Sequence, residues 1–233
     1  MTEYQYIGSE LETFAQARNW KGYLRAAMTP FISGDVLEVG AGIGATMDAL
    51  RAGRERSWTC LEPDASMAAR LRERVSGERR ETTVVAGTIG DLPPDARFDA
   101  VLYVDVLEHI EDDAAEVRRA AARLTRGGHL VVMSPAHQFL YSPFDRRIGH
   151  FRRYDAAQLR ALTPPNTGLV RLTYLDAMGL VLSAANRLLL RSEMPTLAQV
   201  LTWDRWFVPI STRLDPLLGG RVGKSILAVW QRR

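Results

Sequence analysis

An apolar strand, a glycine-rich loop and the start of a helix meet in Val36-Leu37-Glu38-Val39-Gly40-Ala41-Gly42-Ile43-Gly44. Short apolar runs of this kind are typical of parallel strands that are covered on both faces. Glycine lets the backbone turn sharply and approach a ligand where a Cβ atom would clash. The helix expected from Ala45 directs its first N–H groups at that loop. We therefore predict a loop that binds a nucleotide cofactor.

Carboxylates stand at the ends of the predicted strands. The glycines alone do not identify the cofactor, because Gly40, Gly42 and Ala45 also fit the G-x-G-x-x-A pattern of dinucleotide-binding proteins. Glu38 stands near the carboxyl end of its strand, where it can meet an ammonium group. Glu62 follows the strand predicted at 57–61, where a carboxylate can accept both hydrogen bonds from a ribose diol.

A further strand, 100–104, leads into Asp105-Val106-Leu107-Glu108-His109. This series resembles the class I, Rossmann-like S-adenosylmethionine (SAM)-dependent methyltransferases, which carry E-x-G-x-G-x-G, a later acid at a strand end, and L-E-H after the fourth strand. The resemblance covers residues 36–136 well. It implies an α/β fold with a doubly wound, seven-stranded, mostly parallel sheet, an antiparallel last strand and helices on both faces. It also implies SAM as the cofactor.

The resemblance assigns parts of SAM to particular residues. The methionine part is expected against Glu38 and the loop, and the ribose against Glu62 and the neighbouring Pro63. Many relatives carry an acid for the adenine where this chain has Thr88, so adenine recognition is expected to use Thr88, Ile89 or Asp91. The backbone carbonyls of Tyr103 and Val104, at the end of their strand, are expected beneath the sulfonium. The remaining expected cofactor residues are Gly40, Ala41, Gly42 and Gly44.

The rest of the chain alternates strand and helix, which is typical of a parallel sheet covered by helices. We expect one methyltransferase domain over 1–233, divided into an N-terminal helical segment 1–34, a core 35–175, a helical cap 176–220 and a last strand within 221–233. Strands are predicted at 35–39, 57–61, 82–86, 100–104, 129–133, 169–174 and 225–230. Helices are predicted at 9–28, 45–52, 65–75, 113–124 and 156–162, with a loop at 141–154.

Composition restricts the cellular setting. Formal net charge is +3, and Lys21 and Lys224 are the only lysines, so arginine carries nearly all of the positive charge. This balance does not indicate a DNA partner. The single cysteine, Cys60, excludes an internal disulfide and suits a reducing compartment. No apolar run reaches the roughly 20 residues that span a bilayer. We expect a cytoplasmic protein without a transmembrane segment.

The segment after the fifth strand supplies the candidate catalytic residues. It should reach the carboxyl edge of the sheet, where open α/β folds bind ligands. A histidine side chain titrates near neutral pH, so His150 is the expected general base, with Tyr154 orienting the acceptor. Expected substrate-binding residues are Tyr141, Arg152 and Arg153. The alternative is an ordinary loop whose arginines pair with Asp145 and Asp155.

No metal is expected, since many relatives with L-E-H followed by acids bind none. The alternative is a divalent-metal set formed by Asp105, Glu108 and His109, with His137 as a fourth member, as in some quinone-pathway and small-RNA relatives. Oxygen ligands in that set would favour Mg²⁺ or Mn²⁺.

The expected function is methylation of a small molecule, with an oxygen acceptor favoured over nitrogen because a histidine and a tyrosine are at hand. The alternatives are an RNA or lipid-linked methyltransferase and a SAM-binding protein without activity. An NAD-dependent oxidoreductase is a distant alternative, because Tyr154 is followed four residues later by Gln158 and not by lysine. The apolar cap suits a hydrophobic substrate, a buried core, a homodimer contact or membrane contact through Trp203, Trp206 and Phe207.

Overall fold

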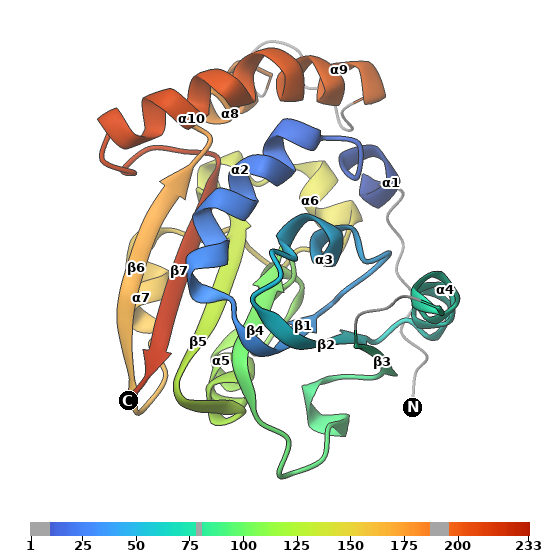
Figure 1. The fold of residues 1–233 in the computed structure, drawn as a ribbon. Helices are drawn as coiled ribbons and strands as arrows, with labels where there is room; N and C mark the ends of the chain where they lie inside the picture. The colour runs from blue at the N-terminus through green and yellow to red at the C-terminus, as the bar shows by residue number, and fades with distance from the viewer. Residues whose placement is uncertain (1–9, 78–80, 187–195) are drawn as a thin grey trace.

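The computed structural model describes residues 10–77, 81–186 and 196–233. Its centre is a seven-stranded sheet in the order β3-β2-β1-β4-β5-β7-β6. Every neighbouring pair is parallel except the two that β7 makes with β5 and β6. The predicted mostly parallel sheet with an antiparallel last strand is confirmed (Figure 1). The strands are β1 (Gly34–Val39), β2 (Glu55–Glu62), β3 (Thr82–Ala86), β4 (Phe98–Val104), β5 (Leu124–Pro135), β6 (Thr167–Leu175) and β7 (Ser225–Arg232).

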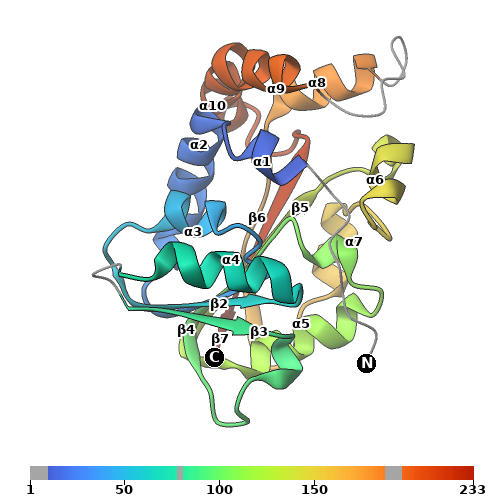
Figure 2. The ribbon, with the colours of Figure 1, turned by 90° about the vertical axis from the view of Figure 1, so that its right-hand side faces the viewer.

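Helices cover both faces of the sheet, because alternate strand residues supply a buried side chain to each face. On one face Val36, Trp58 and Leu102 pack against α2, α3 and α4. On the other, Leu37 and Tyr103 pack with residues of α5 and α7. Figure 2 shows these two helix layers on opposite sides of the strands. The helices are α2 (Arg18–Met28), α3 (Ala45–Leu50), α4 (Ala65–Val75), α5 (Asp113–Ala122) and α7 (Ala156–Ala161).

The segment predicted as a helical cap is helical where it is described. It consists of α8 (Ala177–Ala185), α9 (Leu197–Thr202), a π-helical turn (Trp203–Phe207) and α10 (Val208–Leu217). Figure 1 shows α9 and α10 above the sheet, with α2 directly beneath them. None of the helices described is both long and apolar enough to cross a membrane.

Three predicted boundaries were wrong. The helix predicted at 9–28 is divided into α1 (Glu10–Phe14) and α2. The strand predicted at 129–133 begins earlier, because β5 starts at Leu124, where the helix predicted at 113–124 was expected to end. The segment 141–154 contains a short helix, α6 (Pro143–Arg147), which is capped reciprocally by Ser142 and Asp145. Capping of this kind satisfies backbone N–H groups that the first helical turn leaves free.

Candidate active site

A cavity of about 310 Å³ lies where the carboxyl ends of β1, β4 and β5 meet the cap. One end is formed by the glycine loop and the residues after β2. The other is polar and is closed by α6, α8 and the start of β7. Aromatic side chains from α2 and the π-helical turn form one wall. The principal lining residues are Gly40, Ala41, Gly42, Glu62, Pro63, Val104, Asp105, Glu108, His109, Pro135, Phe144, Asp145, His150, Arg153, Asp176, Trp20, Trp203 and Lys224.

The glycine loop follows β1 with three left-handed residues. Gly40 has φ +68°, and a Cβ atom there would stand 2.6 Å from Cγ2 of Val106. Gly42 has φ +53°, and its N–H donates to Oε2 of Glu62 at 2.7 Å. Both backbone conformations are costly for residues with a side chain. The loop therefore requires glycine, and Gly40, Ala41 and Gly42 line the end of the cavity.

Glu62 is almost completely buried at that end. Besides the Gly42 amide, it accepts the N–H of Asp64 at 2.9 Å. Burial raises the pKa of Glu62, while the two backbone donors oppose that shift. Each carboxylate oxygen uses one lone pair for these bonds and retains another. The geometry leaves Glu62 able to accept further hydrogen bonds from a ligand.

Glu38 lies outside the cavity, contrary to its expected contact with an ammonium group. Its side chain points into the core beneath α3, where Oε2 accepts the indole N–H of Trp58 at 2.9 Å. Burial raises the pKa of Glu38 to about 8. The Glu38 side chain therefore supports β1 beneath the loop. This position corrects the predicted direct contact between Glu38 and the cofactor. Gly44 also lies outside the lining, packed against Leu71 and Arg74.

Of the residues expected to contact adenine or the sulfonium, only some line the cavity. Thr88 is exposed and bound to Asp91 in a capping box, and Ile89 is buried in the core. Both follow β3 just beyond the Glu62 end, without lining the cavity. Val104 lines the cavity, whereas the side chain of Tyr103 turns away and donates its hydroxyl to Glu116 at 2.7 Å.

His150 stands at the polar end in a buried network. Its Nδ1 lies 3.0 Å from Oδ1 of Asp145, and Arg153 binds both Asp145 oxygens at 2.8 and 3.0 Å. Burial alone would raise the pKa of Asp145, but its hydrogen bonds with His150 and Arg153 hold the pKa well below its ordinary value. A buried anion thus fixes the imidazole ring, as in other base–orienter pairs. Asp145, expected only as a surface partner for arginines, is the residue that builds this network.

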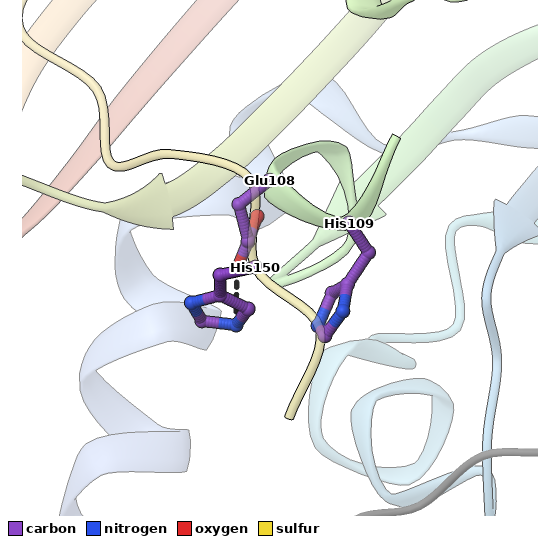
Figure 3. Close-up of side chains that lie close together, drawn as sticks. All are labelled: Glu108, His109 and His150. Atoms are coloured by element: carbon purple, nitrogen blue, oxygen red, sulfur yellow. Dashed lines mark ion pairs between the residues drawn. The ribbon is translucent and has the colours of Figure 1, made fainter. Parts of the chain in front are cut away.

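Glu108, His109 and His150 lie close together, as Figure 3 shows. One ligand atom from each lies within 4.8 Å of the others, and Nε2 of His150 is 3.8 Å from Oε1 of Glu108. Burial, and then the nearby Asp105, raise the pKa of Glu108 well above its ordinary range. Burial also lowers the pKa of His109 to about 4.

These three side chains correct the membership of the alternative metal set: His150 joins it, and Asp105 does not. Two imidazoles and one carboxylate would suit Mn²⁺ or Zn²⁺ better than Mg²⁺. His137 is also excluded, since its Nε2 contacts the carbonyl of Gly223 at 3.0 Å and its ring stacks on Tyr174.

Two charged residues in the cavity, Lys224 and Asp176, had no catalytic or binding role predicted, and Asp105 was expected only in the alternative metal set. Asp105 has φ +54° and opens to the cavity, where burial raises its pKa to about 6. Lys224 projects its ammonium 5.2 Å from the Trp203 ring centroid, and burial lowers its pKa. Asp176 accepts hydrogen bonds from Trp203, Ser211 and the Gly179 amide. Only the scarcity of lysine could have drawn attention to Lys224.

Three residues predicted for catalysis or substrate binding do not line the cavity. Tyr154 is buried, and its hydroxyl donates to Asp113 at 2.7 Å, so it cannot orient an acceptor in this arrangement. Arg152 also pairs with Asp113, at 2.6 Å. Tyr141 donates to the carbonyl of His150 at 2.6 Å and supports that loop from outside. Of the expected catalytic and substrate residues, the structure brings His150 and Arg153 together in the cavity.

Comparison with known proteins gives independent evidence about the family. A model of the methyltransferase domain matches residues 37–130. A probable SAM-dependent methyltransferase of Mycobacterium tuberculosis is 34% identical over 132 residues, which cover 55% of this chain and 46% of that protein. A ubiquinone biosynthesis O-methyltransferase of Xylella fastidiosa is 37% identical over 106 residues, covering 44% of this chain and 42% of the relative. The chain thus spans about half the length of the curated relatives it matches.

The fold is similar over a longer range. A putative methyltransferase of Haloferax volcanii, solved with the Trm112 activator, superposes with a TM-score of 0.61 at 17% identity, covering 94% of this chain and 97% of that one. The glycine loop and Glu62 both lie within the matched residues 37–130. Residues 37–130 of the chain are therefore similar to the methyltransferase domain, and the relatives that match this part are named as SAM-dependent methyltransferases.

Proposed function

We propose that this protein transfers the methyl group of SAM to an oxygen atom of a small molecule. The observation that carries the proposal is a single cavity joining the glycine loop and Glu62 at one end to His150 and Arg153 at the other. A donor seated at the first end and an acceptor at the second would share one space sheltered by the cap. Shelter and alignment are the main requirements of methyl transfer from an activated sulfonium.

In this proposal the ribose hydroxyls of SAM bind Glu62, and its methionine part lies along Gly40–Gly42. The free lone pairs of Glu62 and the position of Gly40, Ala41 and Gly42 along the cavity support that placement. Val104 lies beneath the sulfonium. Adenine extends past Pro63 toward Thr88 and Ile89, which follow the neighbouring strand.

The acceptor would occupy the polar end, with His150 as general base. The Asp145 carboxylate holds Nδ1, which leaves Nε2 as the atom that takes the proton from a hydroxyl. An oxygen acceptor is favoured over an amine because this base is already oriented. Arg153 and Lys224 are the cations available to an acidic group on the acceptor. The relative of Xylella fastidiosa named for ubiquinone O-methylation supports this class of substrate.

The test begins with isothermal titration of the protein with SAM and, separately, with NADH. We expect saturable binding of SAM only, whereas preferential NADH binding would replace the proposal with an oxidoreductase. Mass spectrometry of products from a panel of phenols, alcohols and amines then identifies the acceptor. A protein that binds SAM but methylates neither the small-molecule panel nor RNA would be a binding protein without activity.

A further inference from the structure

The outermost layer of the protein is one continuous helical rod formed by α9, the π-helical turn and α10. Figures 1 and 2 both show it at the edge of the molecule. Its inner side is defined by Asp204, Val208, Ser211 and Asp215, all buried at the spacing i, i+4, i+7, i+11. Residues at that spacing share one helix face. The opposite face of the rod is therefore turned to solvent.

That outer face repeats the same spacing with Trp206, Ile210, Arg213 and Leu217. Trp206 is 60% exposed, Ile210 47% and Leu217 84%, unusually high values for large apolar side chains. Further exposed leucines lie near both ends of the rod, namely Leu197, Leu201 and Leu218. Large apolar side chains that are exposed together on one face often mark an interaction site.

The charges on this face are all positive. Arg205 lies over the Trp206 ring, 5.1 Å from its centroid, while Arg213 and Arg221 are exposed. No ion pair joins these three arginines to a carboxylate within the part of the chain that the structure describes. The two acids of the rod, Asp204 and Asp215, point inward.

We propose that this face, from Leu197 to Leu218, docks on an anionic lipid surface. A helix with an apolar stripe, an interfacial tryptophan and flanking arginines is the form that binds in the plane of a bilayer. The headgroups would neutralise the unpaired arginines, and the acyl boundary would cover Trp206, Ile210 and Leu217.

A second copy of the chain fits this face less well. A two-fold contact uses the same patch on both partners, so arginines would be brought against arginines without any acid between them. Nucleic acid would neutralise the arginines but leave the central apolar side chains uncovered. An anionic lipid surface would both neutralise the arginines and cover the apolar side chains.

Docking would also bring the cavity close to the lipid. Trp203 lines the cavity and donates to Asp176, while Trp206, on the next turn of the rod, is exposed. A helix with its side chains is roughly 10–12 Å across, so the outer face of the rod stands about that far from the cavity wall. The proposal goes beyond methyl transfer and holds whether or not the acceptor is itself a lipid.

Flotation of the full chain with phosphatidylcholine vesicles, with and without phosphatidylserine, tests this surface. We expect flotation only with the anionic vesicles and its loss at high salt. Arg205→Gln with Arg213→Gln should weaken binding by about fivefold for each arginine. Trp206→Ser with Ile210→Ser should reduce it further at any salt concentration. Arg160→Gln on α7, an exposed arginine on another helix, is the matched control.

Circular dichroism and SAM titration establish that each variant remains folded, so a binding defect is distinguishable from failure of the proposed enzyme function. Wild-type protein that stays unfloated with both vesicle types would overturn the docking surface. Equal binding by the face variants and the wild type would overturn it as well. Sedimentation showing a dimer that the same substitutions dissociate, without flotation, would assign the face to a second copy.

Discussion

At the scale of single residues, burial determines what the acids of this protein do. Glu38 and Glu62 both stand near strand ends and look equivalent in the sequence. Glu38 is enclosed in the core and bound by Trp58, whereas Glu62 keeps one side open to the cavity. Both side chains project from the same face of the sheet, since Glu38 pairs with Cys60, but Glu62 lies two residues further toward the carboxyl edge, where the cavity begins.

Glu38→Gln should change how stability depends on pH. In the unfolded chain Glu38 ionises above pH 4.5, whereas in the folded protein its pKa is about 8. The free energy of unfolding should therefore fall as pH rises from 4.5 to about 8, by on the order of 4 kcal/mol from this group. Glutamine does not titrate and can still accept the Trp58 hydrogen bond. Urea unfolding across that range should show diverging curves, and parallel curves would contradict the buried acid.

His150→Ala should reduce kcat by about 10²–10⁴-fold if the imidazole is the general base. Asp145→Asn should also lower kcat, because the buried anion that holds Nδ1 is lost. SAM affinity should stay near the wild-type value in both, since the cofactor end is remote from the change. His129→Gln is the control, because His129 lies on β5, which leads into the site, but away from the carboxyl end of that strand. Full turnover by His150→Ala would remove the base assignment.

At the scale of elements, the start of α2 depends on distant residues. The amides of Asn19 and Trp20 in the first turn of α2 both donate to Asp204 of the cap, at 3.2 and 2.8 Å. The hydroxyl of Tyr23 on the same helix binds Asp215 at 2.6 Å. These bonds explain why the helix predicted from 9 to 28 is interrupted: α2 is capped by tertiary contact.

Gly40→Ala tests the loop between β1 and α3. A left-handed backbone costs about 1–2 kcal/mol for alanine. At Gly40 the new methyl group would also stand 2.6 Å from the branched side chain of Val106. Gly53→Ala is the matched control, with φ +82° but nothing within 4 Å of the added Cβ. Urea unfolding should show a larger loss for Gly40→Ala, accompanied by weaker SAM binding. Equal losses would mean that the loop tolerates the methyl group.

At the scale of the whole molecule, the cap and the N-terminal helix close the sheet edge together. Trp20 from α2 and Trp203 from the cap lie with ring centroids 5.5 Å apart above the cavity. The site is therefore assembled from the glycine loop, the segment after β5, the cap and the N-terminal helix. This assembly is what shields a reacting sulfonium from water.

Turnover should not require a divalent metal. The sulfonium of SAM is already activated, and burial raises the pKa of Glu108 well above its ordinary range, which disfavours the carboxylate form that a metal ion binds. Incubation with EDTA followed by desalting should leave activity unchanged, and Mn²⁺, Zn²⁺ or Mg²⁺ should not increase it. Loss of activity restored by Mn²⁺ would instead assign a metal to Glu108, His109 and His150.

The sequence by itself determined the sheet, its helix layers and the glycine loop that, with Glu62, lines one end of the cavity. Those features depend on local patterns: apolar runs at β1 and β4, glycines at Gly40 and Gly42, and Glu62 at a strand end. Only the tertiary structure decided which polar residues share the cavity. It removed Tyr154 and Arg152, added Asp145 and Lys224, and set the orientation of the cap. The physical reason is that side-chain direction and burial depend on contacts between segments as far apart as Asn19 and Asp204, which local patterns do not encode.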